Sequence, residues 1–157
     1  MENPRSAVIF LEEGARPLAL ESIRGRPVLF WMAERLRRDG VKRVFIASDA
    51  RFAEAVRACF PAGMEITVSD RHGDLMEFLE AEKGLTAVLA RSALPVAQAG
   101  AGFAYAAPPE VLRRTWEIRM TNAIQEAELL SGWIPLYGPD TLAELESVFQ
   151  PEAPEAD

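Results

Sequence analysis

The sequence predicts a three-layer α/β fold with a mostly parallel sheet, followed by a long C-terminal helix. Residues 7–90 alternate between short apolar runs and stretches with helical spacing, which is the pattern of a parallel sheet covered by helices. The chain has 157 residues, enough for one domain with a substantial core. Hydrophobic residues make up 49% and charged residues 26%, a balance that is typical of globular proteins.

The first half of the chain contains four expected strands and three expected helices. After a strand at 7–11, the first helix begins at Pro27, because proline suits the first helical position, and it ends before Gly40. The remaining elements are strands at 44–48, 64–68 and 85–90 and helices at 51–60 and 74–82. The expected sheet core consists of Val8, Phe10, Val44, Ile46, Ile66, Val68 and Val88.

The second half has a weaker pattern. Residues 93–107 are rich in Ala, Gly and Pro, which indicates irregular structure or a weak strand at 102–106. A long helix is expected from Pro108 to about Leu130, and a short one from a capping box at 140–144 to Phe149. The long helix carries an apolar seam that packs either on its own domain or on another helix: Trp116, Met120, Ala123, Ala127 and Leu130.

We therefore expect a single α/β domain over residues 1–150, with an αβ core at 7–95, a helical C-terminal arm at 108–150 and a disordered acidic tail at 151–157. The net charge of −7 argues against a nucleic-acid partner, which would require a basic face. No apolar run approaches the roughly 20 residues that span a bilayer, and no signal peptide is apparent. These observations predict a soluble, cytoplasmic protein without a membrane partner.

The order strand, loop, helix and strand over residues 7–48 includes Pro17-Leu18 and Gly25-Arg26-Pro27 within its loop. This arrangement resembles the sugar-1-phosphate nucleotidyltransferases, above all a shortened, degenerate N-terminal domain of N-acetylglucosamine-1-phosphate uridyltransferase. In that family a Leu-Ala-x-Gly-x-Gly-x-Arg-Met loop is followed by Pro-Lys and Gly-Lys-Pro. The resemblance implies a three-layer, Rossmann-like nucleotidyltransferase fold in truncated form.

The groups with which that family holds a nucleotide are replaced here. Glu12 and Glu13 stand where small residues let the backbone approach the phosphates, and Leu18 replaces a phosphate-contacting lysine. Ser92 and Ala93 stand at the Gly and Asp of a turn whose Asp ligates Mg²⁺ in the family, and alanine has no oxygen for a hard cation. Five residues still match nucleotide- or phosphate-binding positions: Gly14, Arg16, Arg24, Arg26 and Gly73.

These replacements predict a catalytically inactive, nucleotidyltransferase-like protein that acts as a regulatory, scaffold or ligand-sensing module, without catalytic residues, cofactor or metal. Nucleotidyl transfer depends on positioning and charge neutralisation, which the lost groups would have supplied. The alternative is an active or residual transferase that acts on a sugar-1-phosphate with Mg²⁺ and forms a UDP-sugar. Expected partners are a nucleotide or sugar nucleotide, a second copy of the chain, or a related intact enzyme.

Other candidate groups have a structural and a functional reading. His72, the only histidine, lies in a polar turn and is expected to be a solvated loop residue rather than a ligand. Cys59, the only cysteine, is expected in the core, where it would be inert. Glu12 and Glu13 either bind a cation together with Asp49 or lie in a solvated loop. Two aromatic residues near the C-terminus, Trp133 and Tyr137, are candidates for covering a groove.

Overall fold

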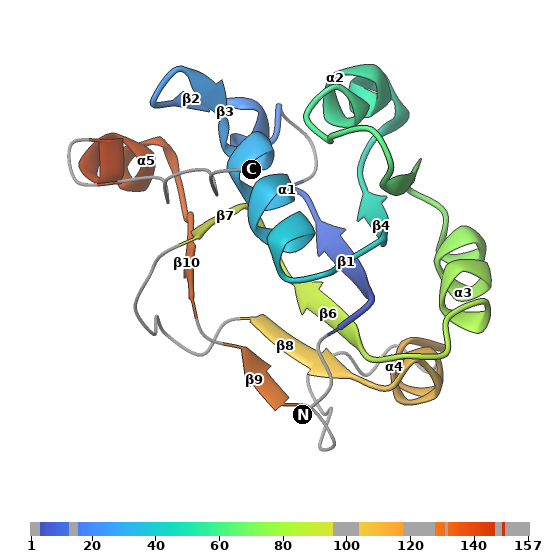
Figure 1. Cartoon of the computed structure of the whole chain (residues 1–157). Helices are drawn as coiled ribbons and strands as arrows, with labels where there is room; N and C mark the ends of the chain where they lie inside the picture. Colours follow the sequence, from blue (N-terminus) through green and yellow to red (C-terminus); the bar gives the residue numbers. More distant parts are fainter. Residues whose placement is uncertain are drawn as a thin grey trace.

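The computed structural model describes residues 4–12, 16–95, 104–117, 128–130, 132–146 and 149. Within them the centre is a six-stranded sheet in the order β5-β4-β1-β6-β8-β9 (Figure 1). The first four of these strands run parallel, whereas β8 is antiparallel to β6 and β9 is antiparallel to β8. The mostly parallel α/β fold is therefore confirmed. The strands are β1 (Ser6–Phe10), β4 (Arg43–Ala47), β5 (Glu65–Ser69), β6 (Thr86–Leu89), β8 (Ala104–Ala107) and β9 (Glu128–Leu130).

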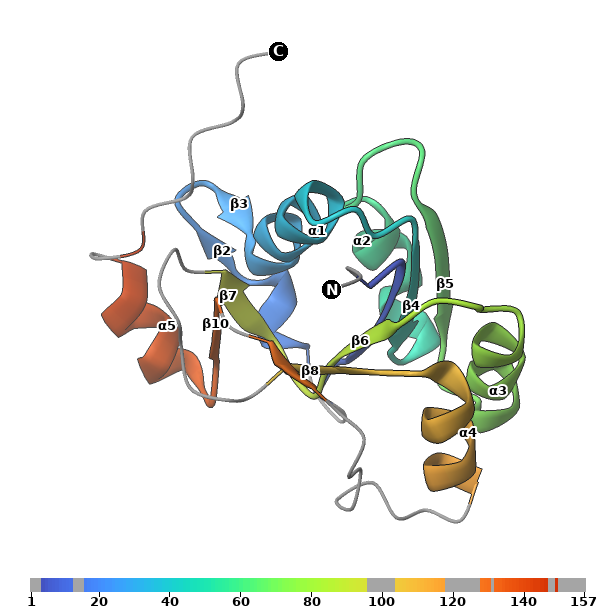
Figure 2. The same ribbon diagram turned by 60° about the horizontal axis from the view of Figure 1, so that its bottom comes forward.

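Helices cover both faces of the sheet, with α1 and α2 on one side and α3 and α4 on the other (Figures 1 and 2). The alternation of β1 explains this, because successive side chains point to opposite faces. Ala7 and Ile9 belong to the cluster under α1, whereas Val8 belongs to the cluster under α3. The helices are α1 (Val28–Arg38), α2 (Ala53–Arg57), α3 (His72–Glu80) and α4 (Pro109–Glu117).

The residues of the expected sheet core are buried to different degrees. Val8, Val44, Ile46 and Val88 are almost completely buried. Phe10, Ile66 and Val68 are only partly buried. The reason for the last two is topological, since β5 is an edge strand and has a neighbour on one side only.

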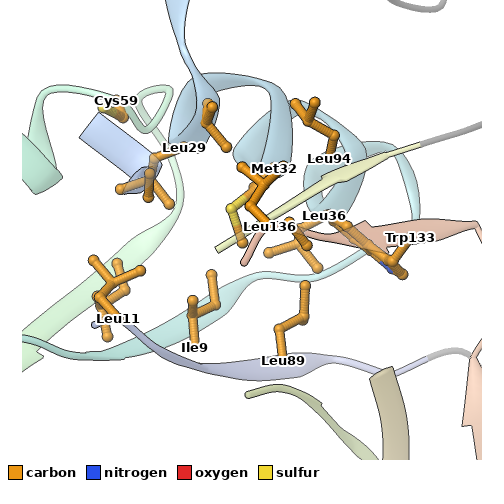
Figure 3. Packing of buried hydrophobic residues seen from close by; sticks show 14 of the residues in the cluster. Ile9, Leu11, Leu29, Met32, Leu36, Cys59, Leu89, Leu94, Trp133 and Leu136 are labelled. Atoms are coloured by element: carbon orange, nitrogen blue, oxygen red, sulfur yellow. The ribbon is translucent and has the colours of Figure 1, made fainter. Parts of the chain in front are cut away.

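Helix α1 packs across the sheet through the apolar face that its sequence predicts. Its inward residues lie over Ile9 of β1 and Leu89 of β6 (Figure 3). Gly40 follows the helix with a φ of 96°, a conformation that glycine adopts readily at a helix end. The buried residues of α1 are Val28, Leu29, Met32, Ala33 and Leu36.

A two-stranded ribbon packs beside the C-terminal half of α1, where Arg35 contacts Gly132 and Trp133. It pairs β7 (Ala93–Pro95) with β10 (Trp133–Pro135) in an antiparallel ladder, and α5 (Pro139–Glu146) follows it. Leu94, Trp133 and Leu136 point into the cluster below α1 (Figure 3). Gly132, with a φ of 93°, precedes β10, and a Cβ there would collide with the guanidinium of Arg35.

The prediction of a long C-terminal helix that reaches Leu130 is wrong for its last residues. Helix α4 spans Pro109–Glu117, and Glu128–Leu130 form β9, which pairs with β8. Pairing with a neighbouring strand therefore overrides helical propensity at this point. Of the expected seam, Leu130 lies in a strand, and Met120, Ala123 and Ala127 lie outside the described residues. The weak strand expected at 102–106 corresponds to β8.

The described part of the segment between β1 and α1, from Arg16 onward, is built from short elements. A 3₁₀ turn at Leu18–Leu20 leads into a small hairpin of β2 (Ser22–Ile23) and β3 (Arg26–Pro27). Its two turn residues, Arg24 and Gly25, have φ of 53° and 80°. Two successive left-handed residues are characteristic of a type I′ turn, whose twist suits a two-residue hairpin.

Two helices differ slightly from expectation. The helix expected at 51–60 is a 3₁₀ turn at Ala50–Phe52 followed by α2, with Val56 and Cys59 buried. Helix α3 begins at His72, so this residue lies in a helix and not in a turn. The expected tail at 151–157 lies outside the described residues. In the part of the chain that the structure describes, no helix is both long and apolar enough to cross a membrane.

Candidate functional site

The candidate site lies at the carboxyl ends of β1 and β6. Chain connections leave β1 toward β4 and β5 on one side and return to β6 on the other side, so the direction of winding reverses between β1 and β6. In open parallel sheets such a switch point leaves a crevice at the carboxyl ends of the strands, where ligands commonly bind. In this protein the loop after β1 and the turn after β6 meet at the switch point through the contacts of Glu12, and this position is called the crevice below.

A carboxylate of the protein itself binds to both walls of the crevice. The Oε2 of Glu12 accepts a hydrogen bond from the backbone N–H of Ser92 over 3.0 Å. The Ser92 hydroxyl lies 2.9 and 3.0 Å from the two carboxylate oxygens and donates to them. On the other wall, Oε1 accepts from the backbone N–H of Leu18 over 2.9 Å. Glu12 is therefore held in place by the protein and is not a solvated loop residue.

Local structure places these three residues together. Glu12 follows Leu11, whose side chain is buried and whose N–H donates to the carbonyl oxygen of Ala47 in β4. Leu18 opens the 3₁₀ turn, and Ser92, completely buried, lies between β6 and β7. Sequence analysis missed this contact. The available signal was the position of Glu12 and Ser92 directly after two strands that prove to be neighbours.

Arg16, expected at the phosphates, makes its contacts within its own loop. Its Nη2 donates to the carbonyl oxygen of Leu20 over 3.1 Å, and its Nε lies 3.9 Å from the carboxylate of Glu21. The side chain of Arg16 is 62% exposed and that of Glu21 is 50% exposed. An ion pair this exposed contributes little to stability. The contacts described for Arg16 thus do not include a group of the crevice.

Arg24 and Arg26 belong to the hairpin, and the contacts described for them are with Phe149 and Phe30. The Nε of Arg24 donates to the carbonyl oxygen of Phe149 over 3.0 Å. The guanidinium of Arg26 lies 4.6 Å from the centre of the Phe30 ring, within the range of a cation–π contact. Arg26, which the sequence resemblance implies near the phosphates, thus stacks on a ring of the first turn of α1.

Of the two glycines of the expected site, Gly14 and Gly73, the structure describes only Gly73. Gly14 lies outside the described residues, as does Glu13. Gly73 lies in the first turn of α3, where a Cβ would meet no atom within 4 Å. Gly73 thus has no conformational or steric requirement for glycine in this fold. Of the five expected positions, none is brought against Glu12 by a contact that the structure describes.

A separate pocket of about 490 Å³ lies at the carboxyl ends of β1, β4 and β5, beside the start of α3. Its floor is apolar and includes Phe45 and Leu75, which are buried. Its rim is polar and carries both charges. The polar lining consists of Ser48, Asp49, Ser69, Asp70, Arg71 and His72.

Internal hydrogen bonds organise the rim of this pocket. Ser69 Oγ donates to Asp74 Oδ2 over 2.6 Å and accepts from the N–H of Arg71 over 3.0 Å. The N–H of Arg51 donates to Asp49 Oδ1 over 2.9 Å, and this bond holds the pKa of Asp49 below its usual value. His72 is exposed and lines the pocket. The sequence analysis expected it to be a solvated loop residue and did not predict a pocket beside it.

One position bears on the Mg²⁺ site that the sequence resemblance implies. Ala93, at the position of the metal-binding aspartate, is completely buried in β7 and has no side-chain oxygen. Among the described residues, no three His, Cys, Asp or Glu side chains come together as a metal site would require. Glu12 and Asp49, considered together as cation ligands, bind Ser92 and Arg51 respectively.

The remaining candidates have structural contacts. Cys59 is buried, and burial raises the pKa of its thiol, which keeps it protonated and unreactive. Trp133 is buried and lies 5.8 Å from the Arg35 guanidinium, so it belongs to the core. Tyr137 is 69% exposed, and the guanidinium of Arg91 lies 4.5 Å from its ring centre.

No family model matches the chain, and no curated protein matches it. Solved structures do resemble it. The inositol-1-phosphate CTP transferase from T. maritima is 14% identical with a TM-score of 0.46, and the match covers 60% of this chain and 46% of that one.

Two further structures give similar values. HddC from Yersinia pseudotuberculosis is 14% identical with a TM-score of 0.46, over 58% of this chain and 49% of that one. The UDP-glucose pyrophosphorylase from Acinetobacter baumanii is 11% identical with a TM-score of 0.44, over 76% and 53%. The chain thus spans about half the length of these three structures.

Proposed function

We propose that this chain is a nucleotidyltransferase-like protein, formed by a single domain over residues 1–150, that does not catalyse nucleotidyl transfer and acts as a ligand-sensing module. The observation that carries the proposal is the carboxylate of Glu12 in the crevice between β1 and β6, bonded to Ser92 and Leu18. A triphosphate would have to displace this carboxylate from its donors and would then lie beside its negative charge.

The chemistry of the reaction makes this arrangement unfavourable for catalysis. Phosphoryl-type transfer is accelerated by cations and backbone N–H groups that offset the charge developing on the phosphates. Here two backbone N–H groups already bind Glu12, and Ala93 offers no metal ligand. The described contacts of Arg16 and Arg26 lie elsewhere. No catalytic residue is therefore assigned, and no cofactor is proposed.

The test is turnover. We expect no pyrophosphate release above blank when the protein is incubated with UTP, CTP or GTP, sugar-1-phosphates and Mg²⁺. An active sugar-1-phosphate nucleotidyltransferase under the same conditions serves as the positive control. Release that is well above blank and proportional to protein concentration would overturn the proposal.

Ligand sensing is favoured over a purely scaffolding role by the pocket beside α3. It lies at the carboxyl ends of three parallel strands and combines an apolar floor with hydroxyl, carboxylate, guanidinium and imidazole groups. Such a combination is usual in small-molecule sites. We propose that its ligand is a nucleotide or sugar nucleotide, bound without reaction.

A thermal-shift screen tests this part of the proposal. A ligand present at about 100 times its Kd stabilises the folded state by about 2.7 kcal/mol, which raises Tm by roughly 5–10 °C for a domain of this size. Replacing Arg71 or His72 with Ala should reduce the shift, because both line the pocket. The matched control is Lys83→Ala, an exposed cation that does not line it. If no nucleotide or sugar nucleotide shifts Tm, a partner-binding scaffold remains.

An active or residual sugar-1-phosphate nucleotidyltransferase, requiring Mg²⁺ and forming a UDP-sugar, is the second candidate. In that reading Arg16, Arg24 and Arg26 would supply the phosphate contacts of a nucleotide after a rearrangement of the loop, since none of the three lines the pocket beside α3. In that case Arg26→Glu would abolish nucleotide binding. In our proposal Arg26→Glu leaves any Tm shift from a pocket ligand unchanged.

A further inference from the structure

Three hydrogen-bond donors converge on one carboxylate in the crevice. They are the backbone N–H of Leu18, the backbone N–H of Ser92 and the hydroxyl of Ser92, at 2.9 to 3.0 Å from the oxygens of Glu12. Ser92 is completely buried. Convergent backbone N–H groups of this kind form concave sites for anions. The side chain that fills this one comes from the protein itself.

The donors are held in place by bonds that do not involve Glu12. The carbonyl oxygen of Ser92 accepts from the N–H of Leu136 over 2.9 Å, which ties the turn after β6 to the C-terminal ribbon. The turn that carries Leu18 is closed by the N–H of Leu20 donating to Pro17 and that of Glu21 donating to Leu18, each over 3.0 Å. Removal of the Glu12 side chain should therefore leave the donors near their present positions.

We propose that these donors form an oxyanion-binding site whose resident ligand is the Glu12 carboxylate, and that a free carboxylate or phosphate binds there once that side chain is removed. The inference rests on the proposed function, in which this crevice no longer holds a triphosphate. In the natural protein the tethered carboxylate has a high effective concentration and excludes free anions. Without it, a buried hydroxyl and two N–H groups lack acceptors, and an external anion supplies them.

The experiment uses Glu12→Ala in the full chain. Its Tm is measured in sodium chloride and with increasing acetate or inorganic phosphate at constant ionic strength. We expect a lower Tm than the natural protein has in chloride, and a saturable rise with acetate, phosphate or both. The two anions separate carboxylate binding from phosphate binding. The natural protein should show no saturable response to either anion.

Matched variants make the result specific. Glu80→Ala removes an exposed carboxylate from α3 and should respond to neither anion. Glu12→Ala combined with Ser92→Ala should lose most of the response, because the hydroxyl donor is gone. Glu12→Gln keeps the side chain in place but sets an amide against donors, so it should be destabilised and remain unresponsive to anions.

Equal responses of Glu12→Ala and Glu80→Ala, or no response by Glu12→Ala, would overturn the inference. If Glu12→Ala does not fold in chloride, the recovery of folded protein on refolding with acetate or phosphate replaces Tm as the readout, with the same two outcomes. These results are independent of the turnover assay. A failed anion response leaves the absence of turnover standing, whereas turnover by the natural protein overturns the proposed function whatever the variant binds.

Discussion

The Nε of Arg24 donates a hydrogen bond over 3.0 Å to the carbonyl oxygen of Phe149, although 125 positions separate the two residues. The Phe149 ring is buried and packs edge-on against Trp31, with 5.8 Å between ring centres. Trp31 in turn donates from its Nε1 to the carbonyl oxygen of Ile23 over 2.9 Å. The end of the described chain is thereby anchored to the β2–β3 hairpin and to α1.

This anchoring predicts that Phe149→Ala is strongly destabilising. Truncation of a buried phenylalanine typically costs about 3–5 kcal/mol, and we expect a loss of this size. Urea unfolding measures the change, with the slope retained and the midpoint lowered. Tyr137→Ala, at an exposed aromatic residue, should cost less than about 1 kcal/mol. Equal losses in the two variants would contradict the anchoring role.

Ala93→Asp tests whether an aspartate can bind Mg²⁺ at the position that the sequence resemblance equates with a metal-binding aspartate. Ala93 is completely buried in β7, so a carboxylate there would be desolvated without a partner. We expect a loss of about 3 kcal/mol or more, and no turnover with Mg²⁺. Ala90→Asp, three residues earlier and exposed, is the control and should be nearly neutral. Mg²⁺-dependent stabilisation of Ala93→Asp would show that the fold still accommodates the metal.

The Arg43 network predicts an acid-dependent loss of stability. Arg43 donates to Glu82 over 3.0 Å and to Glu65 over 2.7 Å. Burial would raise the pKa of Glu82, but hydrogen bonds from the N–H of Gly84, from Arg43 and from the N–H of Lys83 outweigh it and lower the pKa from 4.5. Because the folded-state pKa lies below the unfolded value, this stabilisation is present above the unfolded pKa and is lost as pH falls through the folded one.

We therefore expect the urea midpoint of the natural protein to fall between about pH 6 and pH 3. Glu82→Gln should be less stable at the upper end of this range and should lose less on acidification. Glu80→Gln, an exposed position outside the network, should keep the acid sensitivity of the natural protein. An identical pH dependence for Glu82→Gln and the natural protein would exclude Glu82 as the source.

Self-association is the remaining prediction. We expect a homodimer formed through residues 108–150, although its contact surface is not a helical seam reaching Leu130, since Leu130 lies in β9. In the described part of the sheet, β9 is an edge strand, and strand edges can pair with a second chain. Light scattering should give about twice the chain mass of 17.3 kDa. A mass near that of one chain, unchanged on concentration, would rule the dimer out.

The parallel half of the fold could be predicted because local patterns agree with tertiary structure there. Pro27, the apolar face of α1 and Gly40 each identify one boundary or face of the same helix. Strands β1, β4 and β6 are apolar runs because both of their faces are covered. In the later residues the local sequence pattern does not indicate the tertiary structure. Glu128–Leu130 form a strand because they pair with β8, and their own sequence does not predict this pairing.

The candidate site was less predictable for a related reason. The sequence resemblance identifies Glu12 and Ser92 as positions that differ from the family. It does not predict that the two residues bind each other. Their contact spans 80 positions and depends on β1 and β6 being neighbours. Likewise, Arg24 was expected near a phosphate, whereas its described hydrogen bond goes to the carbonyl oxygen of Phe149, 125 positions away in the sequence.

The strict alternation of β1 also determines where the chain tolerates a change in length. Insertion or deletion of a single residue within Ser6–Phe10 would exchange its two faces, turning Ile9 away from α1 and Val8 toward it. The turn at Ala62-Gly63, exposed and followed by β5 at the sheet edge, has no such requirement. New termini or an inserted peptide tag belong at that turn, and a library that varies loop length should leave β1 intact.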